Sequence, residues 1–284
     1  MTMRLILAIL LWAVPVSAQS VHYRIRMPEP ETHLYHVEMT IEDVGTAPLN
    51  LGLPAWNATY VIRNFSQYLQ EFEVNVPARR VDKQTWRIEP EPGIDTIVVN
   101  YKVFADQTSP FSSELNEQHA FFNSANLLLL WKEQRDLPLT LEIDVPDGWS
   151  VATALPVGRR PNTFEAENYD HLVDCPVDIG VLDRYSFETG GALIHVVVDG
   201  THRNYDAEEL VSMLEPIVQG HFELTQDIPF SEYYFLYHFM NERAGGGMEH
   251  RSSTAIHRSF APDERSVASL AGVSSHEFFH LWNV

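Results

Sequence analysis

The sequence predicts a chain of the α+β class, with an N-terminal all-β, sandwich-like domain followed by a mixed domain of strands and helices. Between residues 19 and 178 apolar and polar residues alternate, which is the period of strands with one buried face. From residue 179 to 284 the pattern changes to continuous apolar strands and an apolar stripe with helical spacing. We therefore expect a domain boundary near residue 178.

A leader segment precedes both domains. Met1 to Ala18 carries one basic residue, Arg4, then an apolar run from Leu5 to Val14, then the small-residue ending Val16-Ser17-Ala18. This order is typical of a cleaved signal peptide, and the apolar run is too short to cross a bilayer. We expect an exported protein, periplasmic or secreted, without membrane insertion after cleavage. An uncleaved anchor or a buried first strand is the alternative.

The charge is strongly acidic. Lys and Arg number 19 against 39 Asp and Glu, giving a formal net charge of -20, and loss of Arg4 with the leader makes it -20 - 1 = -21. Such a surface repels nucleic acid and anionic lipid, so neither is an expected partner. The single cysteine, Cys175, excludes an intramolecular disulfide, and we expect it to be a small buried apolar residue.

The strands of the first domain are predicted from alternating runs separated by Pro and Gly clusters, as in a sandwich. Their apolar positions are Tyr35, Val37, Met39 and Ile41; Ile97, Val99, Tyr101 and Val103; and Leu139, Leu141, Ile143 and Val145.

The second domain is predicted to contain buried strands at Ala192 to Val198 and Tyr233 to Met240, with a helix between them. Pro216 is expected to kink or break that helix. Its apolar stripe consists of Leu210, Met213, Leu214, Ile217, Val218 and Phe222.

The residues His276-Glu277-Phe278-Phe279-His280 spell H-E-x-x-H. In a helix, which residues 263–282 can form, the two histidines lie one turn apart on one face and can both bind one Zn²⁺. Glu277 then lies beside the open metal position, where it can take a proton from water. The alternative is a capping box, S-x-x-E from Ser274 to Glu277, with two structural histidines.

A glycine-rich stretch, Ala244-Gly-Gly-Gly-Met-Glu-His-Arg251, lies shortly before this motif. Three glycines let a ligand backbone approach closely, and Glu249 and His250 then present a carboxylate and an imidazole. A phosphate-binding loop is excluded, because neither G-x-G-x-x-G nor G-K-[ST] occurs there. An ordinary glycine-rich turn remains the alternative.

The two stretches resemble one family of enzymes. "GGMEH" with "SST" after it, followed by "SSHEFFHLWNV", is similar to the M61 peptidases, the glycyl aminopeptidase family, which are relatives of thermolysin-like and M1-type aminopeptidases. "LPAWNATYVIRNFSQYLQEFEV" (residues 53–74) and "LVDCPVDIG" (residues 172–180) resemble the family's β domain and domain junction. Asn57-Ala58-Thr59 departs from the family's Pro-Gly turn.

The resemblance implies a thermolysin-like zinc peptidase domain with Zn²⁺ as cofactor. It makes His276 and His280 zinc ligands and Glu277 the general base, and Glu249 corresponds to the carboxylate that holds the substrate α-amine in M1-type relatives. The residues expected to bind substrate are Gly246, Gly247, Met248 and Glu249.

In this family the third zinc ligand is a glutamate on a later helix, and a PDZ-like domain often follows. The resemblance therefore implies that the 284 residues are an N-terminal fragment, truncated after the H-E-x-x-H helix and incomplete for activity. The longer pattern H-E-x-x-H-x-x-G-x-x-H is excluded, because Asn283 occupies the position of its glycine.

The expected function is a zinc aminopeptidase that releases small N-terminal residues such as Gly or Ala from peptides with a free N-terminus. A zinc-free secreted binding or adhesion protein that uses its β domain is an alternative from another class. A zinc endopeptidase is a third possibility, which Glu249 disfavours.

Overall fold

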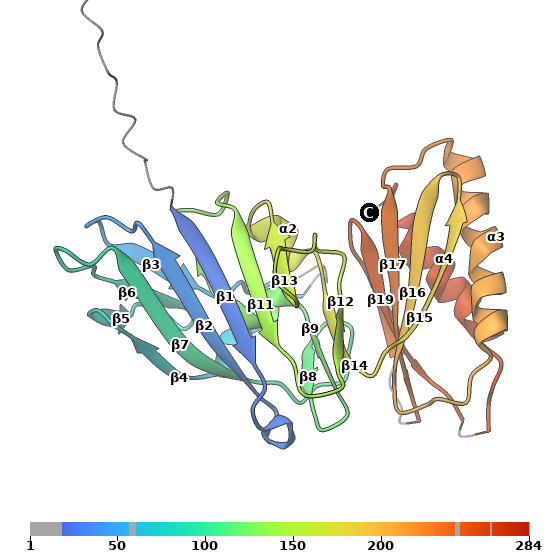
Figure 1. Cartoon of the computed structure of the whole chain (residues 1–284), viewed down its shortest axis with the longest axis horizontal. Coiled ribbons are helices and arrows are strands. Elements are labelled where there is room, and N and C mark those ends of the chain that lie inside the picture. The colour runs from blue at the N-terminus through green and yellow to red at the C-terminus, as the bar shows by residue number, and fades with distance from the viewer. Residues whose placement is uncertain (1–18, 57–60, 242–244, 262, 284) are drawn as a thin grey trace, which may run out of the picture.

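The computed structural model describes residues 19–56, 61–241, 245–261 and 263–283. The predicted signal peptide, residues 1–18, and the departure at Asn57-Ala58-Thr59 lie outside these ranges. Figure 1 shows a β-rich domain beside a smaller domain in which two helices cover one face of a sheet.

Three sheets form the β-rich domain, which confirms the prediction of an N-terminal β domain. The six-stranded sheet has the order β13 (Thr163–Ala166), β11 (Leu139–Asp144), β1 (Ser20–Arg26), β2 (Leu34–Glu42), β7 (Thr96–Phe104) and β4 (Leu69–Val74). A four-stranded sheet has the order β10 (Leu130–Trp131), β3 (Leu49–Gly52), β6 (Thr85–Ile88) and β5 (Ala78–Arg80). The other has the order β12 (Ser150–Ala152), β14 (Val177–Gly180), β9 (His119–Phe122) and β8 (Ser113–Leu115).

Short helical turns connect these strands. They are the 3-10 turns η1 (Pro30–Thr32) and η2 (Phe65–Gln67) and the helices α1 (Ser124–Leu127) and α2 (Tyr169–Val173).

The alternating runs form strands as predicted. In β2 and β7 every predicted apolar position is buried, while the residues between them are partly exposed, because successive side chains of a strand point to opposite faces. One continuous core joins the three sheets. Through it runs the segment Leu127–Leu129, whose three backbone carbonyls accept hydrogen bonds from the hydroxyls of Tyr101, Tyr169 and Tyr23. These bonds satisfy carbonyls that burial would otherwise leave without partners.

The second domain is built on a five-stranded sheet. Its order is β15 (Asp183–Thr189), β16 (Ala192–Gly200), β17 (Glu232–Met240), β19 (Ser253–Ser259) and β18 (Gly245–Glu249). The strands β16, β17 and β19 are parallel, and β18 is an antiparallel edge strand. β17 is buried on both faces, because helices cover one face and the β domain the other.

Two helices lie on the outer face of this sheet (Figure 1). The predicted helix between the strands is α3 (Ala207–Thr225), and it continues through Pro216, so of the two expected effects, a kink or a break, the break is wrong. Pro216 and Ser212, whose carbonyl loses its usual donor, are both exposed, and water can therefore bind that carbonyl. The second helix is α4 (Ala271–Phe279), preceded by the 3-10 turn η3 (Ala268–Leu270).

Helix α4 is shorter than the helical segment proposed from sequence. The described residues between 261 and 267 are not helical, and Leu270 and Phe278 still bury their side chains as expected. The capping-box alternative is wrong, because Ser274 and Glu277 lie inside the helix and not at its start.

The two domains are joined by a link of only two residues, Val181 and Leu182, between β14 and β15. The predicted boundary at residues 178 and 179 falls within β14. Cys175, shortly before it, is buried as expected, and burial raises the pKa of its thiol. Among the described residues, no helix is both long and apolar enough to cross a bilayer.

Candidate metal centre and substrate strand

The H-E-x-x-H residues lie on α4, at the end of the helix that is close to the edge strand β18. Phe278 anchors the helix, since its ring packs against Tyr233 and Phe235 of β17 at centroid distances of 5.0 and 5.7 Å. Polar contacts fix the same helix on two further sides. The Ser274 hydroxyl lies 2.7 Å from that of Tyr237, and Ser275 Oγ lies 2.9 Å from His221 Nε2 on α3.

The structure brings the two histidines of the motif together. His276 Nε2 and His280 Nε2 are 3.2 Å apart. Two ligands of a tetrahedral zinc ion with bonds of 2.0–2.1 Å are about 3.3 Å apart. His280 Nδ1 lies 2.8 Å from the carbonyl of Asn283, which can hold the proton on that nitrogen and leave Nε2 as the donor. The pair therefore fits a zinc ion.

The side chain of Glu277 occupies the space that a side chain at Gly247 would need. A Cβ on Gly247 would lie 2.5 Å from Glu277 Cγ and closer still to its carboxylate, so only glycine fits there. The carboxylate of Glu277 thus lies directly against the backbone of β18. One carboxylate oxygen of Glu277, one ring nitrogen of His276 and one ring nitrogen of His280 lie within 4.8 Å of one another.

Electrostatics favour Glu277 as a base that can also return a proton. Glu277 is only 6% exposed, and this burial raises the pKa of its carboxyl group above the ordinary value. The negative charge of Glu249 raises that pKa as well, while His276 and His280 oppose the shift. A carboxylate with a raised pKa transfers protons more readily near neutral pH.

The glycine-rich stretch forms the strand β18 and not a turn, so that alternative is wrong. Because side chains alternate along a strand, Gly247 and Glu249 face the side of α4, and Met248 faces away from it. The Met248 side chain is buried and lines a cavity of about 480 Å³ with His250 and the exposed Trp56 of the β domain. The substrate-binding roles of Gly246, Gly247, Met248 and Glu249 stay predictions.

The β domain contacts both ends of β18. Asp174, just after α2, lies 3.3 Å from His250 Nδ1 and accepts a hydrogen bond from the backbone N–H of Arg251. At the other end, Pro110 and Phe111 lie close to Gly246, within 3.6 Å of where a Cβ on it would be. Gly246 has φ +147°, a backbone conformation that favours glycine. The position of β18 therefore depends on both domains.

Comparison with known proteins places the chain in a family. The sequence model of the peptidase M61 N-terminal domain matches residues 22–181, which is more than half of the chain. The chain belongs to the peptidase M61 family. A crystal structure of an aminopeptidase N family protein from Idiomarina loihiensis is similar to it, with 30% sequence identity and a TM-score of 0.84. That match covers 93% of this chain and 48% of the other, so this chain spans about half the length of that structure. No match is found among curated proteins.

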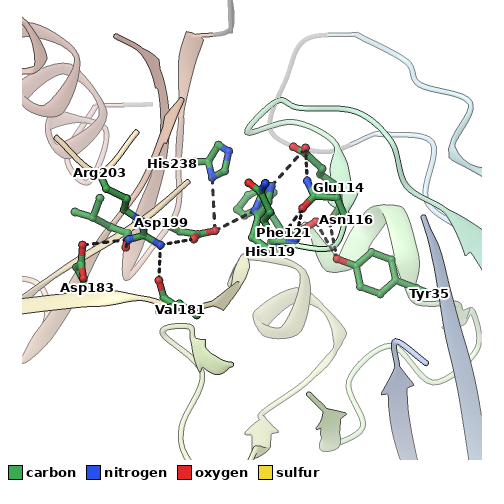
Figure 2. Close-up of polar contacts among 12 residues, drawn as sticks. Tyr35, Glu114, Asn116, His119, Phe121, Val181, Asp183, Asp199, Arg203 and His238 are labelled. Atoms are coloured by element: carbon green, nitrogen blue, oxygen red, sulfur yellow. Dashed lines mark hydrogen bonds and ion pairs between the residues drawn. The ribbon is translucent and has the colours of Figure 1, made fainter. Parts of the chain in front are cut away.

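In this M61 chain, sequence reasoning missed two features. The fit between Gly247 and Glu277 depends on how α4 meets β18, which spacing alone does not reveal. The second feature is a buried cluster of charged and imidazole groups between the domains, around His119 and His238 (Figure 2). His238, a histidine within the apolar run of β17, was the sequence signal that could have indicated this cluster.

Proposed function

We propose that the protein is a zinc aminopeptidase that releases small N-terminal residues such as Gly or Ala from peptides. The observation that carries this proposal is the contact of the Glu277 carboxylate with Gly247, beside the two imidazoles of His276 and His280. It joins a proton-transfer group, two metal ligands and a strand edge in one place. Membership of a peptidase family and the similarity to an aminopeptidase N family protein support it.

Strand β18 offers a binding edge for an extended peptide. Among the described residues it pairs with β19 on one side only, so its other edge leaves backbone groups for a substrate. Addition of a peptide strand to such an edge is a common mode of peptide recognition. The glycines at positions 245–247 let the peptide approach the backbone closely.

Glu277 and the two histidines divide the chemistry. His276 and His280 would hold the Zn²⁺ ion, which would supply Lewis-acid chemistry to the scissile carbonyl and to water. Glu277 accepts a proton from the attacking water and passes it to the leaving amine. Its raised pKa suits it to both steps.

Glu249 supplies the preference for a free N-terminus. It lies two residues after Gly247, on the same face of β18, where a substrate entering along the strand would end. A carboxylate there pairs with the α-ammonium of the first residue, and a blocked N-terminus offers no such charge. An endopeptidase has no need of this group.

The test uses the complete protein with Gly- and Ala-anilides and their N-acetylated forms. We expect about one equivalent of zinc and cleavage of the free-amine substrates alone. Glu249→Ala is expected to keep zinc and lower kcat/KM by roughly 10²-fold, the scale of losing a desolvated charge pair. Glu215→Ala, an exposed position on α3, is the matched control and should leave kcat/KM unchanged.

Three outcomes would contradict the proposal. Zinc below a tenth of an equivalent favours the binding-protein alternative. Loss of zinc in the Glu249 variant makes that residue a ligand. Equal cleavage of free and acetylated substrates indicates an endopeptidase.

A further inference from the structure

A second group of metal-ligating side chains lies between the two domains, away from H-E-x-x-H. The sheet containing β8, β9 and β14 faces the β16–β17–β19 part of the five-stranded sheet, and ionisable side chains from both meet there (Figure 2). All are at least nine-tenths buried. They are Glu114 (8% exposed), His119 (2%), Asp178 (2%), Asp199 (1%), His238 (4%) and His257 (2%).

Many polar atoms of this cluster have no hydrogen-bond partner. They are Glu114 Oε2, Asp178 Oδ1, His238 Nδ1 and both ring nitrogens of His257. Leaving a buried polar group unsatisfied costs free energy, and a charged group costs more. A cluster of this kind is expected to bind something that the protein chain alone does not supply.

Two histidines of the cluster, one from each domain, lie against one carboxylate. The Nδ1 atoms of His119 and His238 both approach one carboxylate oxygen, Asp199 Oδ2, at 3.0 and 3.6 Å. Their rings are stacked, with centroids 4.2 Å apart and planes 19° apart. A carboxylate at Nδ1 of a histidine orients the ring and leaves Nε2 for a metal. Asp199 is placed to do this for His119, while His238 Nδ1 lies beyond hydrogen-bond distance of it.

Glu114 completes a set of three ligands. His119 Nε2 lies 3.4 Å from Glu114 Oε1, which is long for a hydrogen bond and close to the distance of about 3.3 Å between two ligands of a tetrahedral zinc ion. One donor atom each from Glu114, His119 and His238 lies within 4.8 Å of the others. Two imidazoles and a carboxylate are a usual ligand set for zinc.

The surroundings hold the carboxylate of Asp199 in place. Arg203 approaches its other oxygen, Oδ1, at 3.4 Å and also pairs with Asp183 (Figure 2). Gly180 lets the two sheets come together here, because a Cβ on it would lie 3.2 Å from Asp199 Oδ1 and 3.4 Å from His119 Cβ.

We propose that Glu114, His119 and His238 bind a Zn²⁺ ion between the domains, with Asp199 as the carboxylate that orients His119. Two ligands come from the β domain and one from the five-stranded sheet, so the ion ties the domains together. The site is separate from H-E-x-x-H, and the proposal does not depend on peptidase activity.

The alternative to a metal ion in this cluster is a proton bound to His119. Although burial alone would lower it, the contacts with Asp199 and Glu114 raise the pKa of His119 to about 10. An imidazolium between two carboxylates could thus replace the ion. An imidazolium accounts for the contacts of His119 alone, whereas an ion also engages His238, which has a donor atom within 4.8 Å of those of Glu114 and His119.

The experiment counts metal in the complete, untagged protein after removal of the H-E-x-x-H ligands. The double variant His276→Ala/His280→Ala is purified without chelator, incubated with Zn²⁺, dialysed and analysed by mass spectrometry. We expect about one equivalent of zinc to remain, and Co²⁺ in its place to give the absorption of a tetrahedral site. Less than a tenth of an equivalent in the folded variant would overturn the proposal and support the proton.

Further variants in this background identify the ligands. His238→Gln is expected to lose the zinc, and Asp199→Asn to weaken its affinity by roughly 10–100-fold in competition with a chelator, as for other carboxylates behind a ligating histidine. His257→Gln removes a neighbouring buried imidazole outside the ligand set and should keep the zinc. If the His238 variant does not fold, the Asp199 variant decides, and unchanged affinity there overturns the proposal.

Discussion

Gly247→Ala tests whether the position of Glu277 against β18 is required for catalysis. A Cβ at this position would lie 2.5 Å from Glu277 Cγ, whereas two carbons in contact are about 3.5 Å apart. The Glu277 side chain must therefore move by about 1 Å or rotate out of its place. A displacement of that size at a catalytic group can cost on the order of 10² in rate. We expect kcat/KM for a Gly-anilide to fall by about this factor.

The assay compares steady-state kinetics, zinc content and thermal unfolding of the complete protein. The three atoms nearest the new methyl group all belong to Glu277, which is not a zinc ligand, so zinc should be retained. Gly220→Ala in α3, away from the site, is the matched control, because a Cβ there would meet nothing within 4 Å. A double-mutant cycle with Glu277→Ala separates the causes, since a displaced base predicts no further loss in the double variant.

The reasoning is refuted if the Gly247→Ala variant keeps kcat/KM within about threefold of the parent. It is also refuted if Gly247→Ala lowers kcat/KM by the same factor in the parent and in the Glu277→Ala variant. The methyl group would then act on a group other than Glu277.

Three further predictions concern single positions. Glu277→Gln should keep zinc and substrate binding but abolish turnover, measured as kcat with KM and zinc content as controls, and appreciable turnover would remove Glu277 as the base. Gly272→Ala in the exposed first turn of α4, where a Cβ meets nothing within 4 Å, should stabilise the protein by roughly 1 kcal/mol in chemical denaturation; a lower stability would contradict the helix assignment. The buried Cys175 thiol, with its raised pKa, should react with iodoacetamide at pH 8 only after unfolding, and fast labelling of the native protein would show that its burial is wrong.

Local patterns predicted the regular elements and failed where the tertiary environment decides. The alternation at Tyr35 to Ile41 and the stripe of α3 were readable, since burial of one face imposes a fixed period. Pro216 was misjudged, because its effect depends on whether the freed carbonyl faces water or the core. The length of α4 was overestimated because Asp263 to Val267 can form a helix but lies in an irregular segment.

Part of the candidate site was equally predictable. The spacing of His276 and His280 places two imidazoles together in any helix, and the structure confirms that geometry. The Gly247–Glu277 contact and the His119–His238 cluster each join residues that are distant in sequence. A histidine or carboxylate in an alternating strand is indistinguishable from an outward-facing polar residue until the opposite sheet is known.

The two-residue link at Val181 and Leu182 limits how the enzyme can admit a peptide. With β14 ending at Gly180, β15 beginning at Asp183 and Asp174 contacting the residues after β18, the domains have little room to swing apart as a hinged pair. Under the proposed function, a peptide would therefore enter along the free edge of β18. Selection among long or folded substrates would then depend first on whether their N-terminal residues can become extended, before any side-chain preference acts.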